Sequence, residues 1–183
     1  MSTTATADRS CRLKVAMTFA LMTLGLSPTL ATDKCGEVGG ETWTVAGSPY
    51  VVTDDCGTAG VTVGSGTTLT IDAGVEVRFW AGTGLSVSGT LDVNGAVGNE
   101  VLFASDAAVP AAGDWTGLYL DSGSSATLDN AVIRSANYGI QAFGSSATLS
   151  GVESTFNNYA LWVLYGNTTT VDVTGCSFTD NQY

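Results

Sequence analysis

The absence of certain residue types limits the catalytic and metal-binding sites that this chain could form. Its 183 residues include no histidine, which excludes Ser-His-Asp and Cys-His catalysis and any zinc site with a histidine ligand. No two cysteines have zinc-site spacing, and the glycine-rich calcium nonapeptide is absent. Carboxylates, aromatic rings and amides remain as the groups from which a site could be built.

Two carboxylates each follow a leucine that we place in the core. Successive side chains of a strand point to opposite faces, so Asp92 and Asp129, next to Leu91 and Leu128, should point outward. If these leucines stack, the two aspartates lie one strand apart, about 5 Å. Such a pair would suit a retaining glycosidase or a calcium ion. Solvated surface carboxylates are the other interpretation, and we assign no catalytic residue.

A second outward column combines aromatic rings with an amide. It consists of Ser86, Tyr119, Gln141 and Trp162, each next to an apolar residue expected in the core. Aromatic rings on a flat parallel sheet, with an amide between them, could stack on sugar rings. We therefore expect Tyr119, Gln141 and Trp162 to contact a polysaccharide or a cell-surface glycan. Alternatively, they are exposed aromatics covered by a loop at 104–114.

A repeat in the sequence must position both columns. The hexapeptide Gly-Ser-Ser-Ala-Thr-Leu occurs at 123–128 and at 144–149, and a looser copy follows at 166–171. A period of 21 or 22 residues is typical of a solenoid, in which each unit buries its apolar face by stacking on a neighbour.

Short alternating triplets with glycine corners predict parallel strands rather than helices for these units. One interior column should contain Leu69, Leu91, Leu128, Leu149 and Val171. At one corner, Asn137, Asn158 and Asn181 should form a ladder of amides.

The N-terminal residues 1–31 have the pattern of a secretory signal peptide. Basic residues precede an apolar stretch at 15–26 and a small-residue cleavage site at 29–31. The apolar stretch is too short to span a bilayer, so we expect no membrane insertion after cleavage. The mature chain would have three basic and sixteen acidic side chains, a net charge of −13. That charge excludes nucleic acid as a partner.

We therefore expect a secreted protein, extracellular or at the cell surface, with a disulfide between Cys35 and Cys56. Residues 32–60 should form an N-terminal cap that contains this disulfide, and residues 61–183 about five three-sided coils. The chain stops within a coil, which predicts a solenoid truncated at its C-terminus. Further β-helix coils or another subunit should then cover the open end.

Several stretches resemble bacterial secreted proteins with right-handed parallel β-helix repeats, of the pectin-lyase-like superfamily. The resemblance covers roughly residues 41–183, and its most similar stretches are Trp43 with 48–52, 69–79, 89–91 and 113–118. It implies an all-β, right-handed, single-stranded parallel β-helix, and identifies this chain with the N-terminal portion of such a protein.

The superfamily includes polysaccharide lyases, glycoside hydrolases and adhesins, so the fold alone does not give an activity. We expect a non-catalytic module that acts as a surface, adhesive or carbohydrate-contacting protein. The alternative is the N-terminal fragment of a polysaccharide lyase or glycoside hydrolase. No cofactor is expected, apart from the calcium considered at Asp92 and Asp129.

Overall fold

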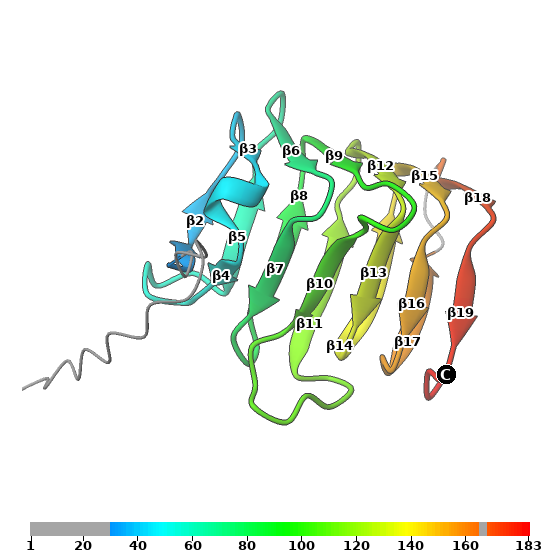
Figure 1. The fold of residues 1–183 in the computed structure, drawn as a ribbon. Coiled ribbons are helices and arrows are strands. Elements are labelled where there is room, and N and C mark those ends of the chain that lie inside the picture. Colours follow the sequence, from blue (N-terminus) through cyan, green and yellow to red (C-terminus); the bar gives the residue numbers. More distant parts are fainter. Residues whose placement is uncertain (1–29, 165–167) are drawn as a thin grey trace, which may run out of the picture.

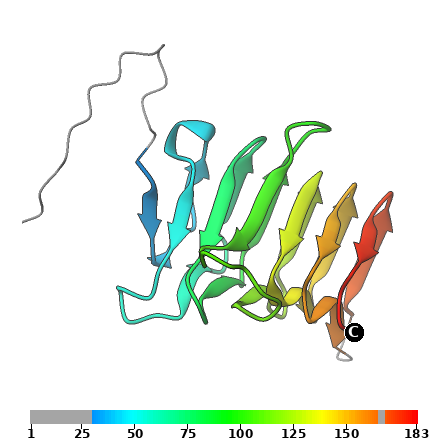
Figure 2. The same cartoon turned by 60° about the horizontal axis from the view of Figure 1, so that its bottom comes forward.

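The computed structural model of the chain describes residues 30–164 and 168–183. It is a three-sided parallel β-solenoid, whose coils follow one another from the N-terminus in blue to the C-terminus in red (Figures 1 and 2). The described residues include one short 3-10 turn, η1 (Val45–Gly47), and no helix with the length and apolar character needed to cross a bilayer. The predicted fold class is confirmed. The predicted signal peptide lies outside the described residues, apart from its last two.

Each coil adds one strand to each of three sheets, and the named strands pair only in parallel. Sheet A contains β1 (Thr32–Lys34), β4 (Tyr50–Val52), β7 (Glu76–Phe79), β10 (Val101–Ser105), β13 (Ala131–Arg134), β16 (Glu153–Thr155) and β19 (Ser177–Thr179). Sheet B contains β2 (Gly36–Glu37), β5 (Gly60–Val63), β8 (Gly84–Val87), β11 (Trp115–Leu120), β14 (Ala136–Phe143) and β17 (Tyr159–Leu164). Sheet C contains β3 (Thr42–Trp43), β6 (Thr68–Asp72), β9 (Thr90–Asn94), β12 (Ser125–Asp129), β15 (Ser146–Ser150) and β18 (Thr170–Thr174).

The described strands form six coils and the first strand of a seventh, one coil more than the sequence predicted. The segment 32–60, which was expected to form a cap, contains β4 and also β1, β2 and β3, which make the additional coil. These strands pair in parallel register with β4, β5 and β6, so this segment closes the solenoid as its first coil. Strands of two or three residues are too short to show an alternating pattern, which is why the sequence did not indicate them.

Aromatic rings fill the N-terminal end of the interior. Trp43 is buried and stacks on Tyr50, with 4.7 Å between ring centroids. The Lys34 ammonium lies 5.9 Å and 5.8 Å from the centroids of these two rings, and its Nζ pairs with Glu41 Oε2 at 2.6 Å. The opposite end is more open, because Val173 is 45 % exposed.

The interior of sheet C corrects the predicted leucine column. Leu69 does stack on Leu91, and Leu128 on Leu149. However, Leu128 aligns with Val93 rather than Leu91, because the register changes by two residues between these coils. One interior column therefore contains Trp43, Ile71, Val93, Leu128, Leu149 and Val173, and the other contains Leu69, Leu91, Ala126, Ala147 and Val171.

The corner between sheets A and B has two short amide ladders where one was predicted. In the first, Asn158 Nδ2 donates to Asn137 Oδ1 at 2.8 Å. In the second, the backbone N–H of Asn157 donates to Asn181 Oδ1 at 2.9 Å, and Asn157 Oδ1 accepts from the backbone N–H of Ala136 at 2.8 Å. Asn181 therefore aligns with the buried Asn157, and its predicted alignment with Asn158 is wrong by one residue.

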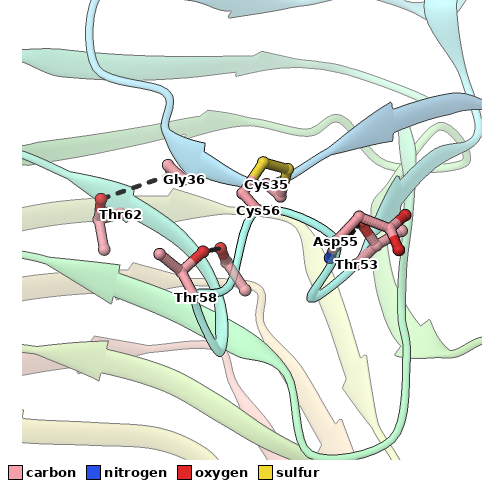
Figure 3. The surroundings of a disulfide bond; sticks show 8 residues. Cys35, Gly36, Thr53, Asp55, Cys56, Thr58 and Thr62 are labelled. Carbon is pink, nitrogen blue, oxygen red and sulfur yellow. Dashed lines mark hydrogen bonds between the residues drawn. A yellow bond between two sulfur atoms is a disulfide. The ribbon is translucent and has the colours of Figure 1, made fainter.

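The predicted disulfide between Cys35 and Cys56 is confirmed, with 5.8 Å between the Cα atoms (Figure 3). Cys35 directly precedes β2, and Cys56 lies in the segment between β4 and β5. The bond therefore links the first coil to the second. Beside it, Thr62 Oγ1 donates to the carbonyl of Gly36 at 3.4 Å.

Candidate functional site

The outer face of sheet B brings the predicted aromatic column together. The register of β8, β11, β14 and β17 places Ser86, Tyr119, Gln141 and Trp162 on four consecutive coils. All four side chains are partly exposed. The alternation predicted from the sequence thus produces this column as expected.

A row of glycines borders the column on the earlier coils. Gly60 aligns with Gly84, and Gly117 lies on the next coil. A Cβ on Gly60 would lie 2.2 Å from the Gly84 carbonyl oxygen, and a Cβ on Gly117 would lie 1.6 Å from the Tyr138 carbonyl oxygen. Gly60 and Gly117 also have φ angles of +114° and +117°, which other residues rarely adopt. Neighbouring backbone therefore requires glycine at positions 60 and 117, and the Thr116 hydroxyl, 2.0 Å from a Cβ built on Gly84, requires it at position 84.

Two adjoining hollows lie over these glycines, with volumes of about 170 and 360 Å³. They share Ala59, Ser86, Thr116 and Tyr119, and so form one continuous depression, which we call the sheet B groove. It crosses β5, β8, β11 and β14, and its other polar or aromatic lining residues are Thr58, Thr62, Asn137, Tyr138 and Gln141.

A tyrosine ladder continues from the groove toward the last coils. Tyr138 stacks on Tyr159, and Tyr159 on Tyr183, with 5.0 Å between centroids in both pairs. Trp162 packs edge-on against Tyr138 and Tyr159, with centroid distances of 5.6 and 4.7 Å. Sequence reasoning missed these tyrosines, although the 21-residue interval from Tyr138 to Tyr159 equals the repeat period. The ladder holds Trp162 in a fixed orientation at one end of the column.

No residue that lines the groove is charged. The closest carboxylate along its outer column is Glu37, which aligns with Thr62. Glu37 Oε1 accepts hydrogen bonds from the backbone N–H groups of Gly64 and Gly39, at 2.9 and 2.8 Å. These two hydrogen bonds lower the pKa of Glu37, and the bond from Gly64 makes the larger contribution.

Another hollow, of about 490 Å³, lies at the corner between sheets A and B. The loop between β10 and β11, which projects from the lower part of the stack in Figure 1, contributes residues 110–112 to it. Phe156, Asp180 and the exposed Arg134 also line this corner hollow. The loop therefore borders the corner hollow rather than the sheet B groove, and does not cover the aromatic column as the alternative interpretation expected.

Arg134 differs from the other two cations of the described chain. Lys34 pairs with Glu41, and Arg78 Nε pairs with Glu76 Oε1 at 2.8 Å. The hydrogen bond to Glu76 raises the pKa of Arg78. Arg134 forms no ion pair within the described residues.

The structure separates the two carboxylates that the sequence paired. Asp92 aligns with Thr127, and Asp129 aligns with Asn94, so the two aspartates differ by one coil and by two positions along the strand. That offset corresponds to about 8 Å rather than 5 Å. Within the described residues, no three His, Cys, Asp or Glu side chains lie close enough together to hold a metal ion. The side-by-side alignment that the sequence predicted is therefore wrong, and calcium binding at Asp92 and Asp129 stays a prediction.

Three parallel sheets wound into one continuous solenoid define the class of the parallel β-helix. The family model described as "Right handed beta helix region" matches residues 50–183, and the chain belongs to this family. The resemblance noted in the sequence is thereby confirmed, including its right-handedness. No curated protein and no solved structure matches the chain. The fold supports a pectin-lyase-like domain in general terms.

Proposed function

We propose that this chain is a secreted, non-catalytic β-helix module that binds carbohydrate through the sheet B groove. The observation that carries the proposal is the partly exposed column of Tyr119, Gln141 and Trp162, whose first two residues line a hollow of about 360 Å³. The flat face of a solenoid can accept an extended ligand without a deep pocket.

The groove offers the two kinds of contact that a sugar needs. The C–H face of a pyranose packs on an aromatic ring, and Tyr119 lines both halves of the groove. Sugar hydroxyls require donors and acceptors, which Ser86, Thr116, Asn137 and Gln141 supply around that ring. The coil-to-coil pairing of sheet B fixes the backbone of these residues, and side-chain bonds from Thr116 Oγ1 to the Thr83 carbonyl and from Asn158 Nδ2 to Asn137 Oδ1 hold two of the four side chains.

Secretion is supported by two independent features. The Cys35–Cys56 disulfide is typical of an oxidising compartment, and the first residues have the pattern of a signal peptide. The sixteen acidic residues of the mature chain would keep such a module soluble outside the cell.

A glycan array, followed by titration calorimetry on any ligand found, tests the proposal. Tyr119→Ala should weaken binding about ten-fold, the equivalent of roughly 1.4 kcal/mol for one lost ring contact. Trp162→Ala should weaken it less, because Trp162 lies beyond the groove lining. Trp80→Ala is the matched control, since Trp80 is 40 % exposed but lies outside sheet B. An array without any bound glycan would refute the proposal.

A further inference from the structure

We infer that the sheet B groove selects a neutral glycan, bound with its chain parallel to the solenoid axis, and rejects glycans that carry carboxylates or sulfates. This inference rests on the proposed function. It starts from the distribution of charge over the three faces. Sixteen carboxylates and three cations occur in the described chain, yet none of them lines the groove.

The charges are concentrated on the other two sheets and on the loops. The outer face of sheet C carries Asp72, Asp92, Asp129 and Asp172, and sheet A carries Glu76 and Glu153. On the side of sheet B, Glu37 lies at one end of the groove, where its Oε2 accepts from Thr62 Oγ1 at 3.4 Å, and Asp121 lies outside the lining. The groove is thus an uncharged strip on a strongly anionic molecule.

The available cations cannot reverse that field at the groove. Lys34 and Arg78 are paired with carboxylates, and Arg134 lines the corner hollow instead. A glycan with a carboxylate on each sugar would therefore be repelled as it approached, and would find no countercharge once bound. A neutral glycan would experience neither effect.

The shape of the groove sets the direction of the bound chain. The groove crosses four consecutive strands, which at about 4.8 Å between neighbours gives a length of about 14 Å. Tyr119 and Gln141 lie one above the other across these strands. One strand spacing is close to the length of one sugar unit in an extended chain, so successive sugars can meet successive coils.

The experiment compares neutral hexose oligosaccharides with the same oligosaccharides oxidised at C6 to uronic acids, so that only the charge differs. For wild-type protein, we expect the neutral series to bind at least ten-fold more tightly at low salt, with affinity rising with chain length until the groove is filled. Added salt should leave the affinity for the neutral series unchanged. It should raise the affinity for the oxidised series, because it screens the repulsion between the glycan and the protein.

Two charge variants locate the effect. Ser86→Lys places a cation at the centre of the groove and should raise the affinity for the oxidised series at least ten-fold. Ser65→Lys makes the same change in net charge on an exposed turn outside the groove, and should have a much smaller effect. Equal effects of the two variants would overturn the local explanation.

The outcomes separate this inference from the proposed function. If neither series binds, both the inference and the proposed function fail for these ligands. If the oxidised series binds wild-type protein as tightly as the neutral one, and Tyr119→Ala abolishes both, carbohydrate binding stands and neutral selectivity is wrong. If oxidised glycans bind tightly but depend on Arg134 and not on Tyr119, the corner hollow is the acidic-sugar site and the inference is likewise overturned.

Discussion

Asn157 is a fully buried amide at the corner between sheets A and B, and its replacement by leucine should strongly destabilise the last coils. Its Oδ1 accepts from the backbone N–H of Ala136 at 2.8 Å. Its Nδ2 donates to the carbonyl of Ile133 at 3.1 Å and to Ser154 Oγ at 2.9 Å. Leucine has a similar volume but can make none of these bonds.

The cost follows from which groups lose their partners. The Ala136 N–H would remain buried without an acceptor, which costs about 1–3 kcal/mol, and each lost donation costs about 1 kcal/mol more. Together these give a loss of about 3–5 kcal/mol in the free energy of unfolding. For a domain of this size, the midpoint of thermal unfolding should fall by roughly 6–20 °C.

Thermal and urea unfolding, followed by circular dichroism, measure this loss. The adjacent Asn158 provides the matched control, because its side chain is only partly buried and makes one bond, to Asn137. Asn158→Leu should therefore cost about 1 kcal/mol. If the two variants were equally stable, the assignment of Asn157 as the buried bonding centre of this corner would be wrong.

Three further variants test other parts of the solenoid. Replacing Cys35 and Cys56 together by serine should lower the free energy of unfolding by about 3 kcal/mol, since the bond spans 21 residues; a much smaller loss in non-reducing urea titrations would contradict the loop-entropy argument. Glu37→Gln should change how stability depends on pH: the lowered pKa of Glu37 stabilises the folded state above its ordinary value of 4.5, and this contribution disappears as the pH falls through the folded pKa. Unfolding midpoints between neutral pH and about pH 3 should thus fall less steeply for the variant, and parallel curves would exclude the effect. Leu128→Ala should lower the free energy of unfolding by about 2–5 kcal/mol. Val173→Ala in the same interior column should lower it by less than half as much, because Val173 is 45 % exposed. Similar losses for the two variants in equilibrium unfolding would show that the last coil is better covered than the exposure of Val173 indicates.

The sequence predicted those features that repeat at a constant interval. The identical hexapeptides at 123–128 and 144–149 align residue for residue, so Leu128 stacks on Leu149 as expected. The outer column of Tyr119, Gln141 and Trp162 was also predictable. In each coil, the apolar residue before the column residue points inward, so the column residue must point outward.

Prediction failed where the interval changes. From β6 onward, each strand of sheet C has two interior positions two residues apart, and both hold apolar residues, so the pattern alone could not choose between Leu91 and Val93 as the partner of Leu128. The loop before β11 removes the constant spacing that would have decided it. The same ambiguity led to the wrong prediction that Asp92 lies beside Asp129. At the corner between sheets A and B, Asn157 and Asn158 are adjacent, so the predicted partner of Asn181 was wrong by one residue.

The sheet B groove could not be predicted from side-chain chemistry alone, because three of its lining residues are glycines. The close approach of Gly60 to Gly84, and of Gly117 to Tyr138, depends on how neighbouring coils pack. A glycine in the sequence could equally mark a turn, and several glycines of this chain do so.

The modular stacking of the coils has an evolutionary consequence. A coil interacts mainly with the coils directly before and after it, so duplication of one repeat unit within a gene inserts a layer without requiring a new fold. A duplicate that kept the glycine before its inward leucine and the tyrosine after it, as in the segment 117–119, would lengthen the sheet B groove by one coil. Homologues with different numbers of repeats would then differ in the length of this groove, while the side chains that each coil contributes stayed the same.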